Sequence, residues 1–293
     1  MWGATGMNVE CVVTGASSQI GGPLLELLPD RFFRVNAWSR KPQAEVRGVA
    51  WQRADLSEVY KIDETVTHLI HLAPLALLAP VLEHAHPMRV IAISTCSVRH
   101  KASSASPAER KLAEKLKNAE KQVIMMARRK GHQLTLLRPA MLYGAGRDGT
   151  VAVLQKLARR FGFLLVPGRA LGLRQPVHVA DVAQAIVGCI DHDKTIGRCY
   201  ELGGRAQITL RQLAERVLTD NGKRARVYSV PSWLLRPVID AARILKIRPD
   251  WDVGLLDRAQ KNQTVDNRPA MRDFGYDPRP FNGKGLTRKV IRR

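Results

Sequence analysis

The sequence is poor in aromatic and in acidic residues, and each shortage limits the kinds of partner that the protein can bind. Of 293 residues only 5% are aromatic, and 47 Lys and Arg stand against 26 Asp and Glu, a formal net charge of +21. A basic surface attracts nucleic acid and anionic lipid. Aromatic residues for base stacking are few, however, and no nucleic-acid module is recognisable. We therefore expect no specific nucleic-acid partner and favour a small anionic substrate.

Cysteine is also scarce, and no pair has Cys-x-x-Cys spacing. This pattern is typical of reduced thiols in a cytoplasmic protein. No cluster has metal-ligand spacing either, because His84 and His86 lie two positions apart without a third partner. We expect no metal site. The four cysteines are Cys11, Cys96, Cys189 and Cys199.

No apolar run is long enough to span a membrane. The longest, LIHLAPLALLAPVL over 69–82, has 14 residues, whereas a spanning helix needs about 20. No basic segment followed by an apolar one opens the chain, so no signal peptide is visible. We expect a cytoplasmic protein without a transmembrane segment. Weak peripheral membrane contact through a basic helix at 107–130 and the basic tail at 284–293 is a minor alternative.

Strand-like and helix-like segments alternate through the first half of the chain. This alternation predicts βαβ units and a parallel sheet in an α/β protein. A second, mixed half contains the segment 208–218, where Thr209 and Gln212 form a capping-box pattern. Strands are expected at 9–15, 33–40, 49–56, 67–74, 89–95, 134–140 and 198–204, and helices at 20–29, 107–130, 150–161, 179–190 and 208–218.

The stretch VVTGASSQIGG (12–22) has the strand–turn–helix context of a dinucleotide-binding turn. Gly15 permits the tight turn and Gly21 lets helix and strand pack closely, while free N–H groups of the helix face a pyrophosphate. Ser18 replaces the middle glycine of the full fingerprint. We assign to cofactor binding the turn residues Gly15, Ser17, Ser18, Gln19, Ile20 and Gly21.

The end of the next strand distinguishes the two nicotinamide cofactors. A carboxylate about 20 residues after the turn binds the ribose hydroxyls of NAD, whereas an arginine accommodates the 2′-phosphate of NADP. This strand ends Trp38-Ser39-Arg40-Lys41, without a carboxylate. We therefore predict that Ser39 and Arg40 bind the cofactor, that NADP(H) is preferred, and that NAD(H) is the alternative.

Seven segments in order resemble the extended short-chain dehydrogenase/reductase superfamily, in its nucleoside-diphosphate-sugar epimerase/dehydratase branch. The likeness covers nearly the whole chain. The segments are TGASSQIG (14–21), ADL (54–56), HLAP (71–74), STCSV (94–98), RPAMLYGAGRD (138–148), PVHVADVA (176–183) and DFGYDPRPF (273–281). The resemblance implies that Arg174 binds a substrate phosphate and that the cofactor is also contacted by Asp55, Leu56, Leu72, Ala73, Pro74 and Pro139.

The resemblance also implies a domain plan. We predict a Rossmann-like doubly wound parallel sheet with a smaller α+β C-terminal substrate lobe. Residues 1–145, with part of 170–200, are assigned to the NAD(P)-binding domain. Residues 146–293, interleaved with it, are assigned to the substrate-binding lobe. Pairing through the helices after strands four and five would give a homodimer, although eight basic and three acidic side chains over 109–130, a net +5, oppose that pairing.

The likeness fails at the residues that carry the chemistry. Family members use Tyr-x-x-x-Lys beside a Ser or Thr, and the tyrosine moves the proton that accompanies hydride transfer. Thr95 matches the hydroxyl residue, but the following helix has no tyrosine. If Glu120 matches the usual glutamate of the family, the tyrosine position falls at about Leu112. The nearest lysines are Lys111, Lys115 and Lys117. We take Thr95 and Lys115 as the catalytic candidates.

Two further residues, His178 and Asp181, look catalytic in isolation, and the resemblance gives them structural roles. His178 and Asp181 lie at a strand–helix junction, where Asp181 is placed to cap the helix. Tyr143 belongs to a Tyr-Gly-x-Gly turn and is expected to contribute to the substrate lobe.

Two functions follow. The first is an NAD(P)-dependent epimerase, dehydratase or reductase acting on a nucleotide sugar or a similar anionic substrate. Thr95 would then hold the reacting oxygen, and water or a lysine would replace the tyrosine. The alternative is a non-catalytic NADP(H)-binding sensor or scaffold, similar to the NmrA-like regulators and to the Rossmann accessory subunit of respiratory complex I.

Overall fold

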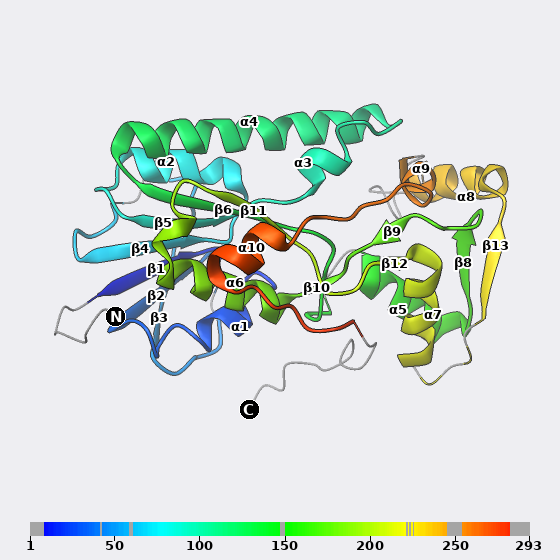
Figure 1. Ribbon diagram of the computed structural model, residues 1–293, viewed down its shortest axis with the longest axis horizontal. Helices are drawn as coiled ribbons and strands as arrows, with labels where there is room; N and C mark the ends of the chain where they lie inside the picture. The colour runs from blue at the N-terminus through cyan, green and yellow to red at the C-terminus, as the bar shows by residue number, and fades with distance from the viewer. Residues whose placement is uncertain are drawn as a thin grey trace.

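The computed structural model describes residues 9–41, 43–58, 61–146, 150–220, 222, 224, 226–244 and 254–281. They form two lobes, a larger one around a central sheet and a smaller one beside it (Figure 1). No helix among the described residues combines the length and the apolar character that crossing a membrane requires.

The larger lobe is built on a parallel sheet of seven strands in the order β11-β6-β5-β4-β1-β2-β3. The chain enters at β1, moves outward to β3, and then returns to β4 and moves outward on the other side. This reversal between β1 and β4 is the switch point at which open α/β sheets bind ligands. The strands are β1 (Glu10–Thr14), β2 (Arg34–Ser39), β3 (Val49–Arg53), β4 (Val66–His71), β5 (Arg89–Ile93), β6 (Gln133–Pro139) and β11 (Cys199–Leu202).

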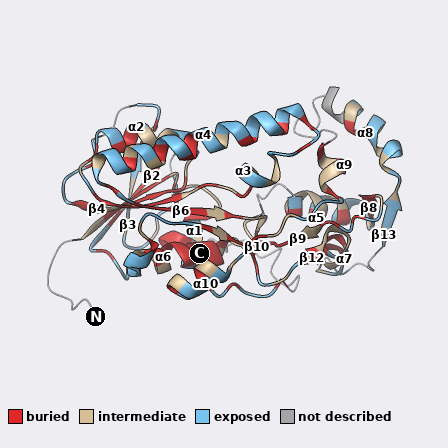
Figure 2. Ribbon diagram, turned by 45° about the horizontal axis from the view of Figure 1, so that its top comes forward, coloured by how far each residue is buried: buried red, intermediate tan, exposed pale blue. Residues whose placement is uncertain are grey.

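Helices cover both faces of this sheet, which is why its central strands are apolar on both sides and buried (Figure 2). Within β1, Val12 packs with the cluster under α2 and α4, while Val13 packs with the cluster under α1, α6 and α10. The two helices on the first face are α2 (Leu78–Glu83) and α4 (Pro107–Lys130), and those on the second face are α1 (Gly21–Leu25), α6 (Val179–Asp191) and α10 (Arg268–Phe274).

The longest helix, α4, has clear end signals. Ser106 caps its N-terminus by accepting a hydrogen bond from the Glu109 N–H at 3.3 Å, and Pro107 occupies the first turn. Gly131 ends it in the left-handed conformation, at φ 75°. The helix predicted at 107–130 is therefore confirmed residue for residue.

The smaller lobe consists of short elements around three two-stranded sheets, β7–β10, β9–β12 and β8–β13. Its strands are β7 (Leu142–Tyr143), β8 (Leu164–Pro167), β9 (Leu173–Arg174), β10 (Val177–His178), β12 (Ile208–Thr209) and β13 (Val227–Val230). Its helices are α5 (Thr150–Phe161), α7 (Leu210–Asp220), α8 (Ser232–Ile244) and α9 (Gly254–Arg258). Three short helices of the larger lobe complete the chain order: η1 (Leu75–Leu77), α3 (Ser97–His100) and η2 (Asp193–Thr195).

The predicted α/β architecture with a doubly wound parallel sheet is confirmed. The capping box is confirmed as well, since the Thr209 N–H donates to Gln212 Oε1 at 2.9 Å and the Gln212 N–H donates to Thr209 Oγ1 at 3.1 Å. The helix expected at 20–29 is wrong in length, because α1 ends at Leu25 and turns follow it. The domain boundaries stay a prediction, and α10 packs on the larger lobe although it lies late in the chain.

Candidate functional site

A cleft of about 280 Å³ lies at the carboxyl ends of β1 to β4, across the switch point of the sheet. We call it the cofactor cleft. Ten of its lining residues are those the sequence assigned to a cofactor: Gly15, Ser17, Ser18, Ser39, Arg40, Asp55, Leu56, Leu72, Ala73 and Pro74. Three more, which sequence reasoning missed, are Trp38, Ala54 and Leu77. Trp38 directly precedes Ser39 and Arg40 at the end of β2. Its position at this strand end could have identified it in the same way.

Gly15 makes the turn that opens the cleft. It adopts a left-handed conformation at φ +66°, and a Cβ placed there would lie 2.5 Å from the Ala73 backbone nitrogen. Gly21 is equally constrained, since its Cβ would lie 1.8 Å from the Ala16 carbonyl oxygen. A side chain at either position is therefore excluded by backbone atoms, and the glycines keep β1, the turn and α1 close together.

The turn also holds a polar atom that suits a phosphate. Ser18 Oγ is buried in the cleft wall, and no described residue hydrogen-bonds to it. Buried hydroxyl groups normally have a hydrogen-bond partner. The oxygens of a dinucleotide pyrophosphate would accept a hydrogen bond from Ser18 Oγ. The residues present thus fit a dinucleotide.

Four assigned residues do not line the cleft. Ile20 and Gly21 are buried in the packing of α1, and Gln19 has a buried Oε1 without a described partner. Pro139 lies at the end of β6, where its carbonyl accepts a hydrogen bond from the Cys96 N–H at 3.2 Å. Their assignment to the cofactor stays a prediction.

Asp55 and Arg40 lie on the open side of the cleft. Asp55 Oδ1 accepts hydrogen bonds from the Ser57 N–H at 3.1 Å and from Ser57 Oγ at 2.8 Å. These bonds, and to a smaller extent the charge of Arg40, lower the pKa of the Asp55 carboxyl. An ionised acceptor and an arginine therefore face the cleft together.

Below the cleft, His71 joins the ends of β1 and β4. It is fully buried, with Nδ1 2.8 Å from Thr14 Oγ1 and Nε2 3.3 Å from the Pro74 carbonyl oxygen. Burial lowers the pKa of His71 to about 4. The ring is therefore neutral at pH 7 and fixes the position of the segment 72–74 that lines the cleft.

A second cavity, of about 240 Å³, lies at the carboxyl ends of β5 and β6. We call it the Thr95 cavity. Its basic and imidazole side chains are His100, Lys101, Arg174 and Arg258, and the remaining lining residues are Thr95, Cys96, Ser97, Ala140, Met141, Thr150 and Gln263. No tyrosine, aspartate or glutamate occurs in this described lining. The cationic side chains suit the cavity to an anionic group, and the tyrosine that moves the proton in the resembled family has no counterpart in this described lining.

Lys115 does not line this cavity. It is exposed on α4, and its assignment to catalysis stays a prediction. Leu112, at the tyrosine position, is 41% exposed, and Leu116 stands four residues later, where the motif has lysine. The lysine that does line the cavity is Lys101, which sequence reasoning missed.

Thr95 is supported from beneath by an ion pair between the buried Glu120 and the partly buried Arg138. Glu120 accepts hydrogen bonds from Ser94 Oγ at 2.6 Å and from Arg138 Nε at 2.8 Å. The hydrogen bond to Glu120 is the main reason why the pKa of Arg138 is raised. Thr95 itself donates from Oγ1 to Ser97 Oγ at 3.3 Å. The network fixes the strand ends from which Thr95 projects.

Arg174 lines the Thr95 cavity, but its guanidinium already has several partners. It donates to the carbonyls of Leu173 at 2.8 Å, Lys261 at 2.9 Å and Arg258 at 2.6 Å. Burial lowers the pKa of Arg174 to about 10. These bonds hold the segment 258–261 against β9, and the role of Arg174 toward a substrate phosphate stays a prediction.

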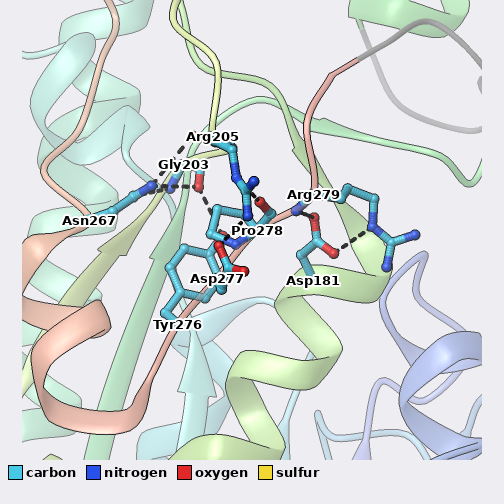
Figure 3. A network of polar contacts seen from close by, with 9 residues as sticks. Asp181, Gly203, Arg205, Asn267, Tyr276, Asp277, Pro278 and Arg279 are labelled. Atoms are coloured by element: carbon cyan, nitrogen blue, oxygen red, sulfur yellow. Dashed lines mark hydrogen bonds and ion pairs between the residues drawn. The ribbon is translucent and has the colours of Figure 1, made fainter.

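The residues that look catalytic in isolation have structural contacts. Asp181 accepts hydrogen bonds from Arg279 Nε at 2.6 Å and from the Arg279 N–H at 3.1 Å, and so ties the C-terminal segment to α6 (Figure 3). His178 caps α6 by accepting from the Ala180 N–H at 3.1 Å, so the assignment of the cap to Asp181 is wrong. Burial raises the pKa of Tyr143 to about 12, and its ring packs edge-on against His178.

No protein-family model matches the chain. Among curated proteins, a mitochondrial NADH dehydrogenase [ubiquinone] 1 alpha subcomplex subunit 9 of Arabidopsis thaliana is 35% identical over 147 residues, 50% of this chain. A UDP-glucose 4-epimerase of Vibrio cholerae is 24% identical over 120 residues, 39% of this chain. The matched regions span about a third of these relatives, 33% and 35%.

Among solved structures, UDP-glucuronic acid 4-epimerase from Bacillus cereus, in complex with UDP-glucuronic acid and NAD, superposes with a TM-score of 0.71 at 16% identity. The match covers 94% of this chain and 96% of that one. The chain therefore has the fold of the extended short-chain dehydrogenase/reductase superfamily, as its motifs predicted.

Proposed function

We propose that this protein binds a nicotinamide dinucleotide in the cofactor cleft as a sensor or scaffold, and does not run the tyrosine-dependent hydride cycle. One contrast carries the proposal. The glycine turn, Ser18 and the cleft walls suit the dinucleotide, whereas the helix over 107–130 contains no tyrosine, and matching Glu120 to the family's glutamate puts Leu112 and Leu116 at the Tyr-x-x-x-Lys positions. The likeness to a subunit of NADH dehydrogenase supports this reading.

The residues of the chain have distinct tasks toward the dinucleotide. The turn and Ser18 Oγ would hold the pyrophosphate, and the Asp55 carboxylate would meet the adenine amine. The nicotinamide ring of a bound cofactor can accept or donate a hydride. Arg40 favours the 2′-phosphate of NADP, because a guanidinium forms paired hydrogen bonds with phosphate. The nearby Asp55 carboxylate and the NAD in the superposed epimerase favour NAD as the alternative.

A second candidate is an enzyme acting on an anionic substrate such as a nucleotide sugar. The observation that favours it is the meeting of Thr95, Lys101 and Arg174 in one cavity at the carboxyl edge of the sheet. Thr95 would hold the reacting oxygen, and Lys101 would take the proton-transfer role that the sequence assigned to Lys115.

Calorimetric titration with NADPH and with NADH tests the binding claim. Loss of a charge-assisted hydrogen bond costs about 1.5–3 kcal/mol, so Arg40→Ala should weaken NADPH binding roughly tenfold or more and NADH binding little. Arg47→Ala, an exposed arginine outside the cleft, is the matched control and should bind both cofactors normally. Failure of the wild type to bind either cofactor would refute the proposal.

A product assay separates the two candidates. The protein is incubated with UDP-glucose or UDP-glucuronic acid and each cofactor, and the sugar is followed by NMR. The proposal predicts a stable sugar and an unchanged nicotinamide absorbance. Product that appears with the wild type and disappears with Lys101→Met would establish the enzyme instead.

A further inference from the structure

Six large apolar side chains are exposed on elements at the far end of the smaller lobe. We call them the distal apolar face: Phe161, Phe163, Leu165, Tyr228, Trp233 and Leu234. They come from α5 and the residues after it, β8, β13 and α8. Figure 1 shows β8, β13 and α8 at the end of the lobe away from the seven-stranded sheet. The aromatic rings form a row, with centroids 6.1 Å apart for Phe161 and Phe163 and 5.9 Å apart for Phe163 and Tyr228.

An apolar groove of about 380 Å³ adjoins this face. It is lined by Leu157, Phe161, Phe163, Leu164, Leu165, Pro167, Leu235, Ile239, Leu255 and Leu256. For comparison, an apolar cavity of about 150 Å³ holds a benzene molecule. The groove is thus large enough for a hydrocarbon segment, and none of the described residues that line it has a polar side chain.

The segments that supply the face are basic. Segments 150–171 and 226–239, which supply all six side chains, contain six Lys and Arg and no Asp or Glu, while Asp220, Asp240 and Asp257 lie outside them. The Arg160 guanidinium lies 5.6 Å from the centre of the Phe161 ring. Trp233 is 70% exposed on α8, beside Leu234. An aromatic and aliphatic surface surrounded by cations is the composition of interfacial membrane-binding helices.

We propose that the distal apolar face binds the surface of an anionic phospholipid bilayer. Trp233 and Leu234 enter the interfacial region, where tryptophan is favoured, and the groove takes a segment of an acyl chain. The surrounding arginines contribute through the negative surface potential, about 1 kcal/mol for each basic residue. The basic helix α4, the minor alternative expected from the sequence, buries Ala113, Val123 and Ala127 against the larger lobe but exposes Leu112 and Met125, and its contact with a membrane stays a prediction. The basic tail at 284–293 lies outside the described residues.

Sedimentation of the full chain with vesicles tests the proposal. The vesicles are phosphatidylcholine alone, or phosphatidylcholine and phosphatidylglycerol in equal parts. The wild type should bind the anionic vesicles, and high salt should weaken binding by screening. The double variant Trp233→Ala, Leu234→Ala should bind at least tenfold more weakly. Arg160→Gln should bind about fivefold more weakly, which corresponds to about 1 kcal/mol.

The matched control is Phe33→Ala, since Phe33 is 72% exposed but lies in the larger lobe, just before β2. This variant should bind vesicles like the wild type. Equal binding of both vesicle types, or unchanged binding by the double variant, would overturn the proposal. No sedimentation of the wild type would overturn it too, and self-association that the double variant abolishes would then assign the face to a second copy of this chain. None of these outcomes depends on dinucleotide binding.

Discussion

The cofactor cleft and the Thr95 cavity open at the same edge of one parallel sheet, but they are built from different parts of the chain. The turn of the cleft depends on backbone packing, because Gly15 lies directly against the Ala73 backbone. The cavity is made by side chains, among them Thr95 and Lys101. A site made by backbone persists as long as the fold does, whereas one made by side chains is lost through substitutions that cost the fold little. Leu112, half exposed on α4, is such a position.

The ion pair beneath the Thr95 cavity should give the largest effect. Glu120→Ala leaves Arg138 without its buried partner, and breaking such a pair costs about 3–5 kcal/mol. Glu83 and Arg129 form an exposed pair at 2.9 Å, so Glu83→Ala is the matched control and should cost about 0–1 kcal/mol. Urea unfolding measures both. Equal losses would mean that the Glu120 network does not support the cavity.

The backbone construction of the cleft predicts the next effect. In Gly15→Ala the new Cβ meets the Ala73 backbone, and the left-handed conformation alone costs about 1–2 kcal/mol. We expect a larger stability loss than that, together with loss of dinucleotide binding. Gly197→Ala separates the two causes, because Gly197 has φ +72° but nothing within 4 Å of its Cβ position. It should lose stability by strain alone and still bind the dinucleotide.

Acid should weaken the protein through the histidine below the cleft. Burial lowers the pKa of His71 from 6.5 to about 4, so the unfolded chain takes up a proton that the folded protein excludes. The contribution of neutral His71 to the free energy of unfolding is therefore fully present above pH 6.5 and is lost as the pH falls towards 4. At pH 5 the loss is about 2 kcal/mol.

The test is urea unfolding between pH 7 and pH 4.5. His71→Gln should flatten the dependence in part, since burial, and then the charge of Arg89, also lower the pKa of His68 to about 4. The exposed His84→Gln is the control and should leave the profile unchanged. A His71→Gln profile identical to that of the wild type would contradict the assignment.

The difference between the cofactor cleft and the Thr95 cavity also explains which site residues the sequence could predict. Cleft residues follow directly after strand ends, so local motifs such as 14–21 and 54–56 identify most of them. Arg258 reaches the Thr95 cavity from a helix late in the chain, and no local pattern indicates that approach. Lys101 was not identified as a cavity residue, because it lies in the turn after the short helix α3 and not in the long helix where the family motif would place a lysine. The contacts of Arg174 with three carbonyls depend on tertiary structure alone.

The smallest expected effect is the difference between substitutions at Lys101 and at Lys115. Lys101 lines the cavity, and its Nζ lies 3.4 Å from Glu109 Oε1, so it is held in place. Lys101→Met should weaken binding of UDP, used as an anionic probe, by about tenfold, the low end of a charge-assisted hydrogen bond. Lys115→Met should change binding less than about twofold, because an exposed charge outside the cavity is screened by solvent and salt. Calorimetry measures both. A larger loss with Lys115→Met would restore the motif-based assignment and would mean that α4 presents its other side to the ligand.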